Sequence, residues 1–271
     1  MTDPLLAIEQ ACSDGLTENN YAACLAAFEE FLAAGCISRL LNAELQEMYD
    51  NEAADRQSWN AGQYVIQANE RYSLHLATHR RSPTFLYSAT SVGMVSPLGT
   101  KPVAYDRYRL PDGWCNETFD PSVRPRLVES AVARPGEIIQ FHRGDIIDLK
   151  FDGEACLAKF FSTDFDAVMW SFDRHSLEPL HAYSADMEST IYTYMAEALA
   201  EFGGQRAVPG LTCLSTHPVH YVRWKAIQML GRVCQASTVS ALEAASNDPH
   251  PHVRNAAQKS LANIRQAGEC V

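Results

Sequence analysis

The sequence lacks the long apolar runs and the cationic leader that mark membrane-inserted and exported chains. No stretch among its 271 residues approaches the roughly 18 apolar residues of a membrane span. The start, MTDPLLAIEQACSDG, has no basic residue before its apolar ones. Glycine (14) and proline (13) are too few for a collagen-like or low-complexity chain. These absences, with 46% hydrophobic residues, predict a globular cytoplasmic protein that does not bind membranes.

Basic residues are also scarce. The chain has 22 Lys and Arg against 33 Asp and Glu, a formal net charge of −11, which disfavours nucleic acid as a partner. The charge is unevenly distributed: residues 1–60 hold 11 acids and 2 bases, whereas residues 201–271 hold 4 acids and 7 bases. This asymmetry indicates either head-to-tail contact between copies or, more simply, two solvated surfaces.

Complete catalytic motifs are missing. The sequence contains no G-x-S-x-G, no phosphate-binding G-x-x-x-x-G-K-[ST] and no G-x-G-x-x-G, so serine hydrolysis and nucleotide-driven chemistry are disfavoured. None of the eight cysteines forms a C-x-x-C pair, and we interpret them as reduced thiols that mainly fill the core. Cys115, in the polar segment GWCNE, is the exception that we expect to be exposed.

The first 60 residues predict an acidic helical segment. Asp3 can cap a helix that Gly15 ends, and Gly35 can end a second one. Apolar residues then recur at helical spacing. They are Tyr21, Cys24, Leu25, Phe28 and Leu32 in the second helix and Ile37, Leu41, Leu45 and Met48 in a third. Such short amphipathic helices need another element to cover their apolar faces.

Residues 61–184 predict short β-strands. Tyr72, Leu74 and Leu76 alternate with smaller or polar residues, the period of a half-buried strand. Further strand-like runs follow, separated by Pro-Gly and Asp-Gly turns, and we expect residues 146–149 and 155–161 to pair as a hairpin. This spacing indicates an antiparallel β-sandwich or small barrel. The fold class predicted for the whole chain is therefore α+β.

Residues 185–271 are again helical and contain a repeat with a period of 31. The matched pairs are Pro218 with Pro249, Val222 with Val253, Arg223 with Arg254, Ala226 with Ala257 and Leu230 with Leu261. The segments HPVHYVRWKAIQMLGRV and DPHPHVRNAAQKSLANI resemble HEAT repeats, in particular the short HEAT-like units also found in bilin lyases. His217 stands where this pattern usually has Asp. A weaker unit precedes them, so that the resemblance covers residues 186–265.

The resemblance implies stacked helical pairs with a surface for a protein partner or a second copy of the chain. At the repeated positions, Arg223 and Arg254 are expected to bond helix ends or neighbouring loops, with anion or partner binding as the alternative. A lyase or chaperone acting on a tetrapyrrole is a more distant implication, because bilin lyases of this type contain many more repeats.

The central strands, with PGEIIQFHRGDII, weakly resemble a cupin. That family holds its metal with a strand H-x-H, and the only H-x-H here, His250-Pro251-His252, lies in a repeat turn. A rearranged metal site could instead use His75 and His142 with Asp106, while Glu129 or Asp145 are alternative carboxylates. Iron or another divalent metal would suit two histidines and one carboxylate. His75 and His79 lie about 13 Å apart on a strand, too far to share one ion.

A polar–aromatic cluster is the other candidate site. Tyr105, Arg107, Trp114 and Cys115 could line a ligand pocket, although sheet packing is the more common explanation of such a cluster. We therefore expect a small-molecule-binding or adaptor protein whose HEAT-like surface binds a protein partner or forms a homo-oligomer. The alternative is a cupin-like, metal-dependent oxidoreductase of the non-haem iron oxygenase type that acts on a small molecule.

Overall fold

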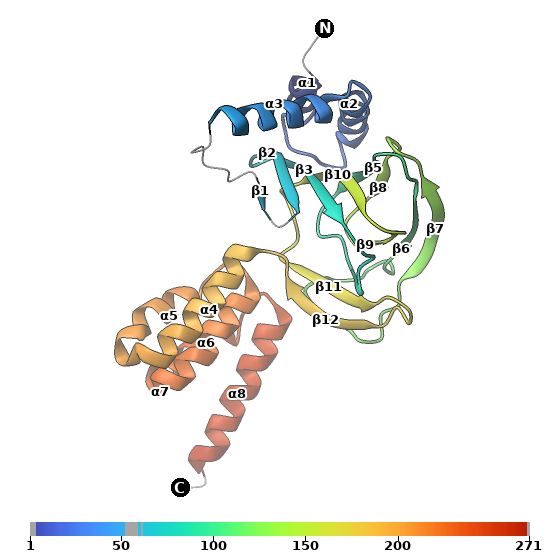
Figure 1. Cartoon of the computed structure of the whole chain (residues 1–271). Helices are drawn as coiled ribbons and strands as arrows, with labels where there is room; N and C mark the ends of the chain where they lie inside the picture. The colour runs from blue at the N-terminus through green and yellow to red at the C-terminus, as the bar shows by residue number, and fades with distance from the viewer. Residues whose placement is uncertain (1–3, 52–58, 61, 270–271) are drawn as a thin grey trace. The chain divides into compact units, whose positions relative to one another are not determined.

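The computed structural model describes residues 4–51, 59–60 and 62–269 of the chain (Figure 1). The chain forms two compact units, Met1–Ala185 and Asp186–Val271. The first contains helices and all the strands, and the second is helical. The α+β class is confirmed, with N-terminal helices, central antiparallel sheets and C-terminal helices. None of the described helices is long and apolar enough to cross a bilayer.

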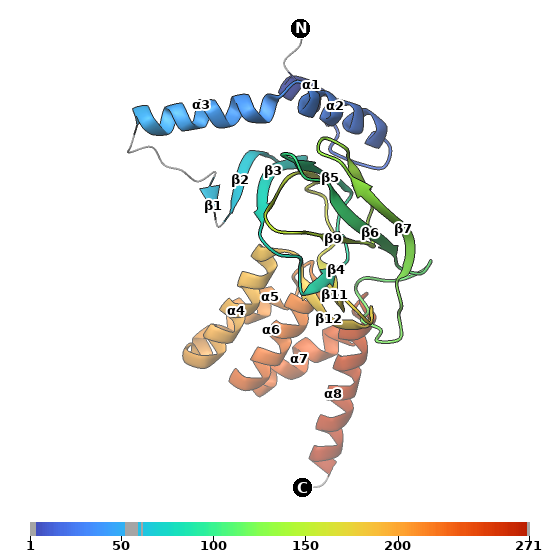
Figure 2. The same ribbon diagram turned by 45° about the vertical axis from the view of Figure 1, so that its right-hand side comes forward.

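Three helices begin the first unit: α1 (Pro4–Ala11), α2 (Tyr21–Ala33) and α3 (Cys36–Asp50). The cap predicted at Asp3 lies outside the described residues. Figure 2 shows the three helices along one side of the strands. Ile8, Phe28 and Phe31 are fully buried in one cluster with Leu74 and Phe160 of the sheet below. The apolar helix faces are thus covered by the strands that follow them in sequence.

Sheet A has six antiparallel strands in the order β1-β2-β3-β10-β5-β8. Its strands are β1 (Trp59–Asn60), β2 (Gln63–Ala68), β3 (Tyr72–His79), β10 (Ala155–Ser162), β5 (Gly93–Leu98) and β8 (Ile139–Phe141). Central β10 pairs with β3 along its whole length, from Ala155 opposite His79 to Ser162 opposite Tyr72. The outer face of the sheet carries Leu74 and Phe160, which pack under the helices.

Two three-stranded sheets complete the first unit, with the orders β12-β11-β4 (sheet B) and β7-β6-β9 (sheet C). Their strands are β4 (Phe85–Tyr87), β11 (Val168–Asp173), β12 (Pro179–Ser184), β6 (Val103–Arg109), β7 (Arg126–Ala133) and β9 (Asp145–Lys150). The three sheets do not close into a barrel, so the barrel alternative is wrong. No strand pairing joins the three sheets into one closed sheet, so each keeps its own edge strands.

The predicted hairpin of residues 146–149 with 155–161 is also wrong. Strand β9 pairs with β6 in sheet C, whereas β10 pairs with β3 and β5 in sheet A. Gly153, with a φ of +91°, lets the chain turn between them, but the turn carries it from one sheet to another. A tight turn in the sequence therefore did not identify the pairing partner.

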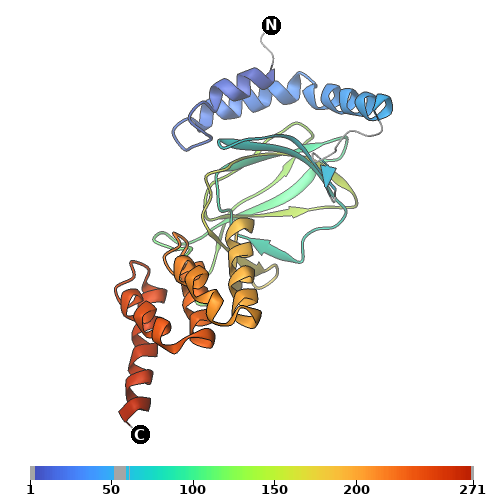
Figure 3. The same ribbon diagram turned by 90° about the vertical axis from the view of Figure 1, so that its left-hand side faces the viewer.

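The second unit consists of helical pairs (Figure 3). Its helices are α4 (Met187–Phe202), the 3-10 helix η1 (Gly204–Ala207), α5 (Val208–Leu214), α6 (His220–Val233), α7 (Gln235–Ala245) and α8 (Pro251–Glu269). The Asp186 side chain accepts hydrogen bonds from the backbone of Glu188 and Ser189 and caps α4. Leu211 and Leu230 join α5 to α6, and Leu242 and Val253 join α7 to α8.

Candidate ligand cavity and repeat surface

A cavity of about 340 Å³ lies between the three sheets of the first unit. Sheet A contributes Val95, Phe141, Lys159 and Phe161, sheet B contributes β4, and sheet C contributes Ile147 and Leu149 of β9. Its size is at the lower end of the range for small-molecule sites in proteins. Its wall is largely apolar, with a few hydroxyl groups and ionisable side chains. This is the composition expected of a site for a small organic molecule.

Lys159 is the unusual residue of this wall. Successive residues of a strand point to opposite faces, and Ala158 and Phe160 pack on the helix side, so that Lys159 points to the inner side with Phe161. Burial lowers the pKa of its ammonium group. In the part of the chain that the structure describes, its side chain forms no ion pair or hydrogen bond. Lys159 is half-buried, and lysines that are drawn into an apolar surface are normally paired.

Two histidines share this inner face. Lys159 lies opposite His75 in the ladder between β10 and β3. The His75 ring hydrogen-bonds to the Ser73 hydroxyl and lies 5.2 Å from the ring of Phe161. Burial, and secondly the charge of Lys159, lowers the pKa of His75 and of His79. The inner face of sheet A thus places the amine of Lys159 beside His75, with His79 four residues further along β3.

The acid in the cavity wall is already neutralised. Asp145 is fully buried and accepts from Arg109 Nε at 2.8 Å, while Arg107 Nη1 lies 3.6 Å away. The backbone N–H of His142 also donates to Asp145 at 3.0 Å. Because two guanidinium groups share this carboxylate, it leaves no negative charge available to the lysine across the cavity.

The structure does not bring the predicted metal ligands together. His142 Nδ1 lies 2.9 Å from Glu18 Oε1, and its ring lies 5.0 Å from that of Tyr21. Asp106 accepts from Lys150 at 2.6 Å on sheet C, and His75 lies on sheet A. Within residues 4–51, 59–60 and 62–185, these three side chains do not form a cluster of neighbouring ligand atoms. The alternative carboxylates, Asp145 and Glu129, are bonded to arginines.

The four residues of the predicted polar–aromatic pocket do not meet in one pocket. Tyr105 and Arg107 both donate to Glu129, at 2.8 and 3.0 Å, on the face of β6 and β7. The Trp114 ring packs edge-on against that of Trp170 at 5.4 Å. Cys115 is exposed, as we expected. None of the four lines the cavity that contains Lys159.

Lys159 is not among the residues that the sequence indicated for a site. The signal was present, since a single lysine interrupts the apolar strand run ACLAKFF. This run does not show on which side of the sheet the lysine lies, because both faces of β10 are covered. Helices cover one face, and sheets B and C lie over the other.

In the second unit the repeated arginines make repeated contacts. Arg223 Nη1 donates to the carbonyls of His217 and Pro218, and Arg254 Nη1 donates to those of Asp248 and Pro249, the positions 31 residues later. Each arginine therefore closes the turn before its own helix.

The departure at His217 has a structural equivalent. The Asp248 carboxylate accepts from the N–H of His250 two residues later, and His217 Nδ1 accepts likewise from the N–H of Val219 at 3.1 Å. A ring nitrogen thus takes the place of the carboxylate oxygen that usually stabilises this turn.

Residues 177–262 match the family model for HEAT repeats. The match extends over less than half of the chain and coincides with the helical pairs just described. No curated protein matches the chain.

Solved structures give only distant likenesses. A hydroquinone 1,2-dioxygenase from Sphingomonas sp. TTNP3 with 4-hydroxybenzoate bound is 13% identical, with a TM-score of 0.32, over 41% of this chain and 70% of that one. A protein from Neisseria meningitidis is 13% identical, with a TM-score of 0.26, over 43% of this chain and 96% of that one. These scores are too low to assign the β unit to a fold family.

The first helix of the HEAT repeats is apolar on two opposite faces. Its inner face buries Ala196 against α5 and α6. Its outer face exposes five large apolar side chains: Met187 (75%), Ile191 (48%), Tyr194 (65%), Met195 (51%) and Phe202 (78%). Their spacing places them in one stripe along the helix. We call these five residues the α4 stripe.

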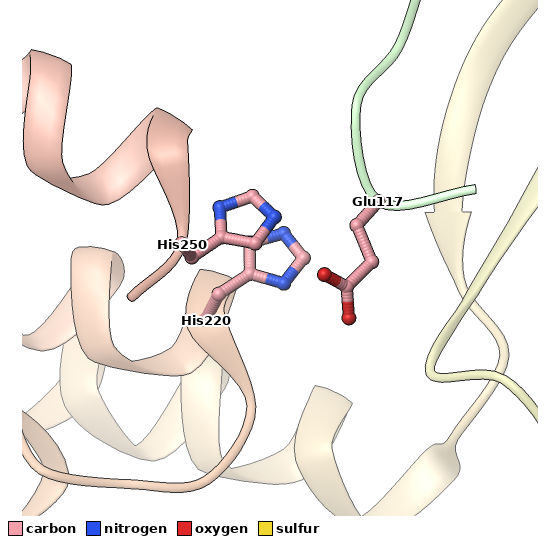
Figure 4. Close-up of side chains that lie close together, drawn as sticks. All are labelled: Glu117, His220 and His250. Carbon is pink, nitrogen blue, oxygen red and sulfur yellow. The ribbon is translucent and has the colours of Figure 1, made fainter. Parts of the chain in front are cut away.

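Two histidines stack within the HEAT repeats (Figure 4). The rings of His220, which begins α6, and His250, which precedes α8, are 3.7 Å apart and nearly parallel, at 8°. Burial, and then the neighbouring His250 and Arg223, lowers the pKa of His220 to about 4. The His220 imidazole is therefore neutral at neutral pH.

Proposed function

We propose that the chain is a ligand-binding adaptor whose HEAT repeats bind a protein partner through the α4 stripe. The observation that carries this proposal is the exposure of five large apolar side chains on one face of a helix whose opposite face is buried. Isolated exposed apolar residues are ordinary, but a continuous stripe is typical of an interaction surface. HEAT repeats in general bury such faces against a neighbouring helix.

The charges around the stripe indicate the kind of partner. Helix α4 contains Glu188, Glu197 and Glu201 and no basic residue. Glu197 is paired with Lys225 of α6 at 2.7 Å, and the side chains of Glu188 and Glu201 lie on either side of the stripe. An apolar surface with acidic borders fits an amphipathic helix flanked by lysine or arginine. A second copy docked antiparallel through α4 would instead place Glu188 near Glu201, and like charges would oppose it.

The test uses a synthetic 18-residue amphipathic helix of leucine and lysine and a counterpart with glutamate for lysine. Fluorescence anisotropy of each labelled peptide with the full chain measures the affinity. We expect the lysine peptide to bind, and the double variant Ile191→Glu/Met195→Glu to weaken binding by about tenfold or more, since it introduces charge into the apolar stripe. Both positions are exposed, so the variant should fold.

The matched control is the double variant Leu127→Glu/Val132→Glu, which charges two similarly exposed residues of β7. It adds the same two negative charges and should leave lysine-peptide binding within about twofold. Equal effects of the two double variants would show that net charge alone attracts the peptide and would overturn the proposal. So would equal binding of the glutamate peptide, or a wild-type dimer in light scattering that only the α4 variant dissociates.

A further inference from the structure

The cavity between the three sheets contains a cation without a matching anion. Lys159 lies on its wall, and among the described residues its ammonium group has no acidic partner. The cavity's own carboxylate, Asp145, is held by Arg107 and Arg109. An ammonium group in an apolar wall is costly unless an anion accompanies it.

We propose that Lys159 binds the carboxylate of a small, largely apolar organic acid in this cavity. The carboxylate would accept a charge-assisted hydrogen bond from the Lys159 ammonium group. The apolar body of the acid would contact the rings of Phe141 and Phe161 and the side chains of Val95 and Ile147. The volume of about 340 Å³ suits an acid with roughly one ring or a short alkyl chain.

The surrounding polar groups agree with an anionic ligand. Lys159 and the hydroxyl-bearing residues Thr90 and Ser91 all line the wall. These groups can donate hydrogen bonds, whereas the described carboxylate of the wall is occupied by arginines. A cationic or metal ligand would find no available anionic group there among the described residues.

The experiment is isothermal titration calorimetry of the full chain with benzoate, phenylacetate and hexanoate, each compared with its own amide. The amides keep the shape and remove the charge. We expect at least one acid to bind about tenfold or more tightly than its amide. The variant Lys159→Met, which keeps an unbranched apolar side chain, should abolish this preference. Lys150→Met, which removes a lysine already paired with Asp106, should preserve it.

Two results would overturn the inference: no acid binding better than its amide, or a preference that persists in Lys159→Met. Circular dichroism checks that the variant folds, and loss of an uncompensated, half-buried charge gives no reason for it to unfold. The measurement needs no partner protein. It is therefore independent of the α4 stripe, and either proposal can fail without the other.

Discussion

Arg223 and Asp248 form a two-point ion pair that joins successive HEAT repeats. The Nε and Nη2 atoms of Arg223, in α6, donate to the two carboxylate oxygens of Asp248, before α8, at 2.8 and 2.7 Å. Both side chains are nearly buried, at 11% and 7% exposure. The same arginine closes the turn at Pro218. One side chain thus fixes both its own repeat and the next.

Removing this arginine should destabilise the HEAT repeats strongly. Arg223→Ala leaves the Asp248 carboxylate buried without its counter-ion, which costs about 3–5 kcal/mol in comparable cases. Arg254→Ala removes hydrogen bonds to two carbonyls only and should cost about 1–2 kcal/mol. Hydrogen exchange of the backbone amides of α6, α7 and α8 measures the local free energy of opening. Equal losses in the two variants would contradict a special role for the ion pair.

Removing the negative charge of Asp145, in the cavity wall, should also destabilise the protein. Asp145→Asn keeps the shape but removes the charge between Arg107 and Arg109, so we expect a loss of about 3 kcal/mol in the free energy of unfolding. Asp164→Asn is the matched control, because Asp164 is 82% exposed in its pair with Arg143 and such exposed pairs contribute about 0–1 kcal/mol. Urea denaturation, monitored on the strands by far-ultraviolet circular dichroism, compares the two. A loss below 1 kcal/mol for Asp145→Asn would contradict the prediction.

The charge of Lys159 should be visible in its histidine neighbours. Lys159→Met removes a positive charge that lowers the pKa of His75 and His79, so both pKa values should rise. They should stay below the ordinary value, because burial is the larger cause in both. Histidine ring signals followed by NMR during a pH titration measure the change, with Lys150→Met as control. Unchanged values would mean that Lys159 does not face these rings.

The histidine stack should make the HEAT repeats sensitive to acid. The pKa of His220 falls from 6.5 to about 4 on folding, so between these values the unfolded chain binds more protons than the folded one. The unfolding free energy must therefore decrease as the pH falls from about 6.5 to about 4. His220→Gln should flatten this dependence, whereas His181→Gln, at an exposed position, should not. Thermal unfolding across this pH range measures both, and identical pH profiles would refute the assignment.

The candidate sites differ in how far the sequence could predict them. The 31-residue repeat placed Arg223 and Arg254 at equivalent positions, and their contacts depend on a turn of the same few residues. The sequence could not predict in this way whether His75 and His142 lie close together. They belong to separate strands or loops whose distance depends on sheet order, and His142 lies instead beside Glu18 of the N-terminal segment.

Local periodicity determined the helices of the N-terminal segment and the strand character of Tyr72–His79, because each depends on neighbouring residues along one element. The 31-residue repeat indicated the stacked helical pairs through its resemblance to HEAT repeats. Only the tertiary structure decided that β9 and β10 separate into different sheets. That separation leaves Lys159 on the wall of a cavity between three sheets and leaves Asp145 to the arginines of β6. Pairing between strands distant in sequence sets which face becomes an interior, and no single strand's pattern encodes it.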